Sequence, residues 1–194
     1  MTRRAFGSAL VLAAAFAAVS PASAQSPDAA LVAESRAAVK GLGESLKTAL
    51  VGALKTGGPI AAIETCQQAA PSIASEQSTT HGLKVARTAL RVRNEGNAPD
   101  AFERKVLEDF AAKLKAGADP ATLDHAETVQ VGGEKHFRYM KAIPMAAEPC
   151  MACHGSDLKP EIKAEITKRY PHDQATGFSP GELRGAFTVT KVLK

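Results

Sequence analysis

The residues best placed to do chemistry form one short motif, Cys150-Met151-Ala152-Cys153-His154. Two cysteines three positions apart lie on the same face of a helical turn, and a histidine follows the second one directly. This C-x-x-C-H pattern is the attachment signature of c-type haem, because each sulfur can add to one vinyl group and the imidazole can then bind the iron. The sequence therefore predicts one covalently attached haem c with His154 as an iron ligand.

Three other uses of the motif have to be weighed. A redox-active C-x-x-C pair normally belongs to a βαβ unit, whereas this motif follows a predicted hairpin. A zinc site needs further ligands at metal spacing, and the sequence has no second C-x-x-C and no H-x-x-x-H. A disulfide between the two cysteines would leave the histidine unexplained. Haem attachment is the interpretation that accounts for all three residues.

The second axial ligand of such an iron is left open by the motif. Electron-transfer cytochromes c usually supply a Met after the motif, but no Met follows Met151. Cys66 is the remaining cysteine, and a lone cysteine is most often a buried, inert residue. As a ligand, its thiolate would stabilise ferric iron and lower the reduction potential. The competing candidates are Met140, Met145, His81, His136 and His172.

The N-terminal residues 1–24 have the pattern of a secretory signal peptide. Two arginines supply the positive start, and the apolar run Ala9–Val19 is too short to span a bilayer. Ala22-Ser23-Ala24 is a suitable cleavage site, although a transmembrane anchor is the alternative interpretation. We expect cleavage after Ala24, a single mature domain over residues 25–194 that does not span a membrane, and a periplasmic location in an oxidising compartment.

Composition narrows the class of protein further. Of the 194 residues, 45% are hydrophobic and 23% are charged, as in an ordinary globular domain. The 24 Lys and Arg against 20 Asp and Glu give a net charge of +4, and two of the arginines lie in the predicted signal peptide. A balance this small predicts no nucleic-acid binding, which needs a clustered basic face.

Long helices are predicted to precede the motif. Leucines at i+4 spacing predict a helix from Ser26-Pro27 to Gly57-Gly58. A second helix is predicted to begin at Pro59 and to carry Cys66. Pro71 is expected to kink or interrupt this second helix, because proline lacks the backbone N–H.

The rest of the chain mixes strands and helices. Alternation over residues 83–92 predicts a strand, and Asp100 with Glu103 forms a capping box for a helix through Leu114. The other predicted elements are a loop over 94–99, a β-hairpin with strands 128–131 and 134–143, a short helix over 162–170 and a closing strand over 183–193. This mixture predicts an α+β fold with an antiparallel sheet.

Arginines near the first predicted strand are candidates for binding the haem propionates. Arg87, Arg91 and Arg93 alternate along residues 83–93, and guanidinium groups suit carboxylates. A solvated strand edge is the alternative interpretation for at least one of them. Candidates for the pocket wall, which could equally belong to the sheet core, are Phe137, Tyr139, Ile143 and Met145.

Several further segments, taken together with the haem motif, form a specific combination. They are the A-I-x-x-C segment from Ala62 to Cys66 with residues 70–74, then residues 91–94, 97–100, 137–140 and 143–145, and finally residues 170–173, 175–178, Gly181 and 184–186. With these segments the chain resembles a family of single c-haem, PAS-like periplasmic or lumenal sensor domains over nearly its whole mature length. The resemblance implies a PAS-like antiparallel sheet flanked by helices, with Cys66 as the distal ligand and His154 as the proximal ligand.

Three classes of function are weighed on this basis. The first is a binding protein that senses redox state or a small diatomic gas and passes its signal to a separate protein partner. The second is a soluble periplasmic electron-transfer cytochrome c. The third is a haem enzyme such as a peroxidase, which needs acid–base groups at an open distal site, and nothing places His81 or His136 there. We expect the first, with the electron carrier as the alternative and no enzymatic activity.

Overall fold

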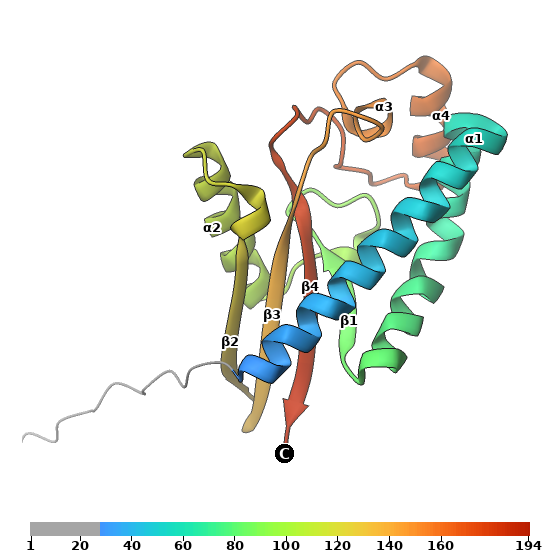
Figure 1. Ribbon diagram of the computed structural model, residues 1–194. Helices are drawn as coiled ribbons and strands as arrows, with labels where there is room; N and C mark the ends of the chain where they lie inside the picture. The colour runs from blue at the N-terminus through green and yellow to red at the C-terminus, as the bar shows by residue number, and fades with distance from the viewer. Residues whose placement is uncertain (1–27) are drawn as a thin grey trace, which may run out of the picture.

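Four antiparallel strands form the centre of the computed structural model, which describes residues 28–194 (Figure 1). The expected α+β class is therefore confirmed. The predicted signal peptide and the predicted helix start at Ser26-Pro27 lie outside the described residues. In chain order the elements are α1 (Ala29–His81), β1 (Lys84–Thr88), the 3-10 helix η1 (Glu95–Asn97), α2 (Ala101–Lys115), the 3-10 helix η2 (Pro120–Thr122), β2 (Asp124–Val131), β3 (Glu134–Pro144), α3 (Met151–His154), α4 (Pro160–Arg169) and β4 (Leu183–Leu193).

The strands are ordered β1-β4-β3-β2 in the sheet. The predicted hairpin joins β2 to β3 through Gly132 and Gly133, whose φ angles of 57° and 87° suit a two-residue turn that needs two positive values. Strand β2 begins at Asp124, four residues before the predicted start at Thr128. Residues 124–127 are polar or small and only half-buried, so no hydrophobic alternation marks them in the sequence.

Helices α1 and α2 cover opposite faces of this sheet. Phe137 and Tyr139 of β3 pack into a core with Leu42 of α1. Met140, which points to the other face of the same strand, packs with Phe110 of α2. The sheet is thus buried on both sides by a helix.

Helix α1 consists of two segments that meet at Gly58, whose backbone is left-handed with φ 69°. The second segment runs back beside the first (Figure 1). The two segments are so close that a side chain at Gly41 of the first would collide with Gln77 of the second. The predicted boundary between two helices at Gly57-Gly58 is therefore confirmed, whereas the predicted interruption at Pro71 is wrong, because the second segment continues through this proline. Packing of Ile63 on α4 and of Ile73 on the sheet core supports the helix on both sides of Pro71.

Two predicted boundaries bear on the site. The capping box of α2 is confirmed, because Asp100 accepts the Glu103 N–H at 2.8 Å and Glu103 accepts the Asp100 N–H at 3.1 Å. Strand β1 is shorter than the predicted 83–92, because the chain leaves the sheet after Thr88 and Ala89 N–H donates to Asn97 instead. No helix between residues 28 and 194 combines the length and the apolarity needed to cross a bilayer.

Candidate functional site

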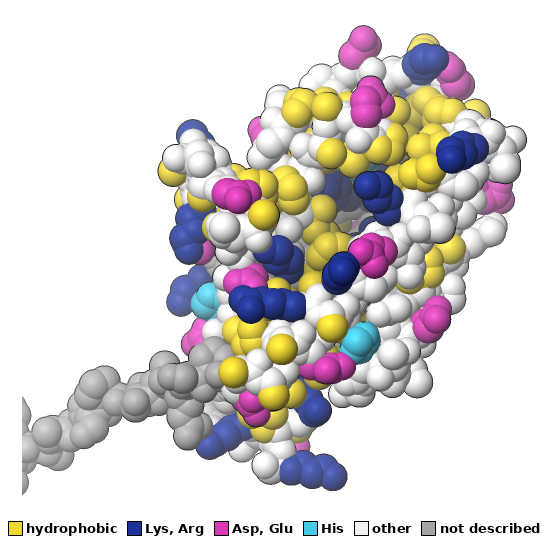
Figure 2. Space-filling model, viewed as in Figure 1, with side chains coloured by type: hydrophobic (Ala, Val, Ile, Leu, Met, Phe, Trp, Pro, Cys, Tyr) yellow, Lys and Arg dark blue, Asp and Glu magenta, His cyan; other side chains and the backbone are white. Residues whose placement is uncertain are grey.

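A cavity of about 550 Å³ lies between the two segments of α1, strand β1 and the turn that carries the C-x-x-C-H motif. In the space-filling view it is a hollow with hydrophobic side chains around its opening (Figure 2). The first segment of α1 contributes a stripe of leucines at i+4 spacing, and the end of β3 contributes Ile143 and Pro144. The volume falls in the range of sites for cofactors and other small molecules, about 300–1,000 Å³.

The C-x-x-C-H motif forms the one-turn helix α3 against this cavity. The His154 N–H donates to the Cys150 carbonyl at 3.0 Å, which closes the turn. Cys150, Cys153 and His154 all line the cavity. Both cysteines and Cys66 are free thiols. The structure thus brings these three motif residues together at one cavity.

His154 is held in one protonation state by its surroundings. Its Nδ1 lies 2.6 Å from the Ala175 carbonyl oxygen, which can only accept, so the proton sits on Nδ1 and Nε2 keeps a free lone pair. Burial lowers the pKa of His154 to about 3, with help from the positive charges of Arg93 and Arg184. A neutral imidazole with a free Nε2 is the form that binds a metal.

Arg93 ties the motif to the loop before β4. Its Nε donates to Asp173 Oδ1 at 3.0 Å, and its Nη2 donates to the carbonyls of Cys153 at 2.6 Å and Ala175 at 3.1 Å. The Arg93 and Asp173 side chains are only 12% and 8% exposed. Because the Ala175 carbonyl also accepts the hydrogen bond from His154 Nδ1–H, this network fixes the orientation of the imidazole.

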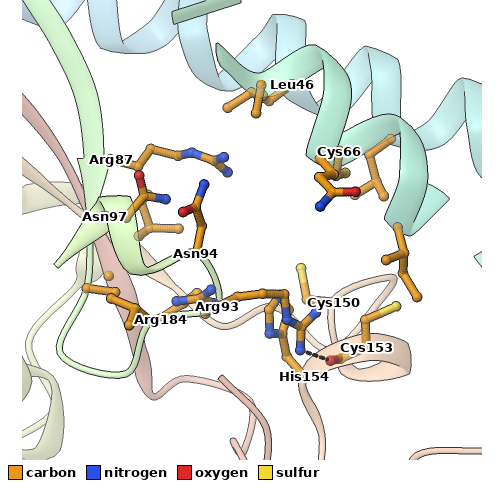
Figure 3. Close-up of a pocket in the computed structure, with 18 of the residues that line it drawn as sticks. Leu46, Cys66, Arg87, Arg93, Asn94, Asn97, Cys150, Cys153, His154 and Arg184 are labelled. Carbon is orange, nitrogen blue, oxygen red and sulfur yellow. Dashed lines mark hydrogen bonds between the residues drawn. The ribbon is translucent and has the colours of Figure 1, made fainter. Parts of the chain in front are cut away.

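Cys66 comes to the same cavity from the second segment of α1. Ala62, Ile63, Cys66 and Ala70 share one face of the helix, and this face lines the cavity. In the close-up, Cys66 lies across open space from Cys150, Cys153 and His154 (Figure 3). Burial raises the pKa of the Cys66 thiol, and the charges of Arg87 and Arg93 oppose that rise.

Helix α4 supports the segment that carries Cys66. Arg169 forms an ion pair with Glu64 at 3.4 Å and donates to Gln67 at 3.0 Å. On the buried side, Ile63 packs with Ile162 and Ile166. The Cys66 thiol therefore lies on a helical segment that packs against α4, the helix that follows the C-x-x-C-H motif.

The structure separates the competing ligand candidates. Met145 is buried and lines the cavity. Met140 belongs to the core under α2. His81 pairs with Glu34, and His136 lies 3.6 Å from Glu134. His172 is exposed in the loop after α4. Of the wall candidates, Ile143 and Met145 line the cavity, whereas Phe137 and Tyr139 are in the core under α1.

The predicted arginines divide in the same way. Arg87 and Arg93 line the cavity. Arg91 does not, because its guanidinium stacks 3.9 Å from the centre of the Phe178 ring and its Nε donates to Gln174. Arg184 also lines the cavity, and sequence reasoning gave it no role. It stands at the start of β4, almost 100 residues from Arg87, so only the β1–β4 pairing brings the two together.

Comparisons with known proteins place the chain in a family. The family model described as Tll0287-like matches residues 7–191. The structure is similar to that of the cyanobacterial heme-protein Tll0287, with a TM-score of 0.60 and 23% identity over 86% of this chain and 98% of that chain, which shows a shared fold. Among curated proteins, no match was found. Since the family model spans most of the sequence, this chain belongs to the Tll0287-like family.

Proposed function

We propose that this chain is an exported cytochrome-like protein with one haem c, and that it senses redox state or a small gas rather than acting as an enzyme. The observation that carries the proposal is that a C-x-x-C-H turn and the Cys66 thiol face one another across a single cavity (Figure 3). The similar structure is that of a heme-protein, which supports the same cofactor here.

The residues of the cavity fit the requirements of haem c. Cys150 and Cys153 stand three positions apart on one turn, the spacing that two thioether bonds require. His154 offers a free Nε2 and Cys66 offers a thiol, and both are known types of haem iron ligand. When bound, the haem would supply a one-electron redox centre whose iron also binds small diatomic gases.

The position of Cys66 favours a sensing role. Its helical segment lies between Gly58 and Gly82, which both have positive φ angles, 69° and 61°. A segment bounded by two such glycines can reorient as one body. If Cys66 dissociated from the iron, the segment would lose one attachment and keep its contacts with α4, the sheet and the first segment of α1. A change at one thiol would thereby alter a surface that a protein partner can read.

Export completes the proposal. We take residues 1–24 as a cleaved signal peptide and the periplasm as the location of residues 25–194, on the sequence pattern given above. The reducing cytoplasm is not where proteins with this signal act.

Absorption spectroscopy of Cys66→Ala tests the ligand assignment. The variant should lose the ferric spectrum of the wild type, because the thiolate would no longer reach the iron. Met145→Leu is the matched control, since Met145 also lines the cavity and should leave both spectra unchanged. Spectra of Cys66→Ala that equal the wild type in both redox states, or a change in Met145→Leu alone, would remove Cys66 from the site.

Carbon monoxide titration of the reduced protein separates sensor from carrier. A sensor in which Cys66 leaves ferrous iron should bind the gas at the vacated position. A protein that takes up no carbon monoxide and keeps its reduced spectrum would instead be the electron-transfer cytochrome.

A further inference from the structure

The charged side chains around the cavity are all of one sign. Lys47, Arg87, Arg93 and Arg184 line it, and its described lining includes no Asp or Glu. A buried cation without a partner is costly, so cations that gather in a cavity indicate an anionic ligand. The question is which of them keep donors free for that ligand.

Arg93 is largely committed to partners within the protein, and only its Nη1 forms no hydrogen bond among the described residues. Its Nε and Nη2 are used by Asp173 and by the carbonyls of Cys153 and Ala175, within 2.6–3.3 Å. The charge of Arg93 is balanced by Asp173. Arg93 therefore serves to position the motif.

Arg87 and Arg184, in contrast, keep most of their N–H donors free. Over residues 28–194, the Arg87 side chain forms neither a hydrogen bond nor an ion pair, and it extends past Asn97 and Asn94 into the cavity (Figure 3). Arg184 donates once, from Nη1 to the Arg91 carbonyl at 3.3 Å, which leaves its other donors free.

The electrostatics of Arg184 agree with a missing anion. Burial, together with the neighbouring charges of Arg93 and Arg87, lowers the pKa of Arg184 to about 10, although the charge of Asp173 opposes this fall. Burial lowers the pKa of Arg87 as well. The two guanidiniums repel one another until a negative group lies between them.

We propose that Arg87 and Arg184 together recognise the two carboxylates of the porphyrin ligand, whereas Arg91 does not. This inference rests on the haem function proposed above and deepens it. Guanidinium groups bind carboxylates through paired N–H donors, which explains arginine rather than lysine at both positions. The arginines lie on the β1–β4 side and Cys150 and Cys153 lie on α3, so the propionate edge and the vinyl edge of one porphyrin would each meet its own partners.

Metal-free protoporphyrin IX and its dimethyl ester test this assignment on the full cofactor-free chain. Neither probe has iron, so the difference in their affinities, measured by fluorescence, isolates the carboxylates. The wild type should bind the dicarboxylate at least about tenfold more tightly than the ester. Arg87→Gln and Arg184→Gln should each reduce this preference by about tenfold, with the fold checked by circular dichroism.

Arg91→Gln and Lys47→Gln are the matched controls. Arg91 is a neighbour that stacks on Phe178, and Lys47 is an exposed cation at the cavity rim, so both variants should keep the full preference. Equal binding of the two porphyrins, or loss of the preference in a control variant, would overturn the assignment while leaving the haem function intact. A chain that takes up neither porphyrin would count against the haem function itself.

Resonance Raman spectra of the haem-loaded protein give a second measurement that needs no cofactor-free chain. The propionate bending bands should shift in Arg87→Gln and Arg184→Gln and stay in place in Arg91→Gln. Bands that stay in place in all three variants would overturn the proposal.

Discussion

Two groups of arginine side chains, one buried and one half-buried, differ in whether the chain supplies their carboxylate partners. On the α2 side of the sheet, Arg138 Nη2 lies 2.8 Å from Asp100 and 3.2 Å from Glu103. Thr188 adds a hydrogen bond of 2.7 Å to the Glu103 carboxylate. In the cavity under α1, Arg87 and Arg184 line a wall without a carboxylate among its described residues. In the first group the chain itself supplies carboxylates that face the guanidinium, whereas in the second group we propose that a ligand supplies them.

The difference shows how a binding site can be told from a structural network. Both groups contain arginines that are withdrawn at least in part from solvent, so residue type alone does not distinguish them. Charge balance distinguishes them, because a buried cation without a carboxylate partner lowers the free energy of unfolding of the folded chain. Variants that remove one member from each group should therefore have opposite effects on stability.

Glu103→Ala should have the largest effect. It removes one of the two carboxylates that face the buried Arg138 guanidinium and also one half of the α2 capping box. We expect the free energy of unfolding to fall by about 3–5 kcal/mol. Urea denaturation of the cofactor-free chain measures this change. A loss below about 1 kcal/mol would mean that the Arg138 group stabilises the fold no more than the cavity arginines do.

The pH dependence of the cofactor-free chain should be the next largest effect. The pKa of His154 is about 3 in the folded chain, against about 6.5 in the unfolded chain. Between these pKa values the unfolded chain binds a proton that the folded chain does not bind. The free energy of unfolding is therefore highest above pH 6.5 and decreases as the pH falls towards 3. Urea midpoints at pH 7 and pH 5 should differ by less in His154→Gln than in the wild type. Equal differences would contradict the buried neutral imidazole.

Arg184→Met should have a smaller effect of the opposite sign. In the cofactor-free chain it removes an unpaired cation that faces Arg87 and Arg93, so the free energy of unfolding should rise by about 1 kcal/mol. Arg138→Met is the matched comparison and should lose stability, because it leaves Glu103 and Asp100 without their cation. If both substitutions destabilise equally, the two arginine groups are alike and the comparison fails.

Lys113→Ala should have the smallest effect and sets the scale for the others. Lys113 pairs with Asp109 one turn away on α2, at 2.7 Å, and both side chains are about half exposed. Such pairs contribute about 0.5 kcal/mol or less. A larger loss in urea denaturation would mean that surface charge, rather than burial, governs the stability of this chain.

Local signals in the sequence predicted much of the fold. The capping box of α2, the Gly132-Gly133 hairpin and the closing strand are all confirmed, because each depends on neighbours within a few residues. The helix end at Gly57-Gly58 was predicted as well, but the continuation of the second segment through Pro71 depends on packing on both sides of this proline. The early end of β1 depends on the loop that returns to Asn97. Neither feature is set by local periodicity.

The candidate site was predictable only in part for the same reason. The C-x-x-C-H motif is contiguous, so Cys150, Cys153 and His154 were found from spacing, and Cys66 was selected through a family resemblance. Arg184 and Asp173 gain their roles from contacts with a loop some 80 to 90 residues earlier. Nothing in the local sequence separates Arg91, which stacks outside the cavity, from Arg87, which lines it.

The intact mass and absorption spectrum of the exported protein test the central claim most directly. Made in a host that attaches haem to exported chains, the protein should be coloured and should carry the mass of residues 25–194 plus one haem. The double variant Cys150→Ala/Cys153→Ala should lose the added mass under denaturing conditions. A colourless wild-type protein at the mass of the bare polypeptide would contradict the account.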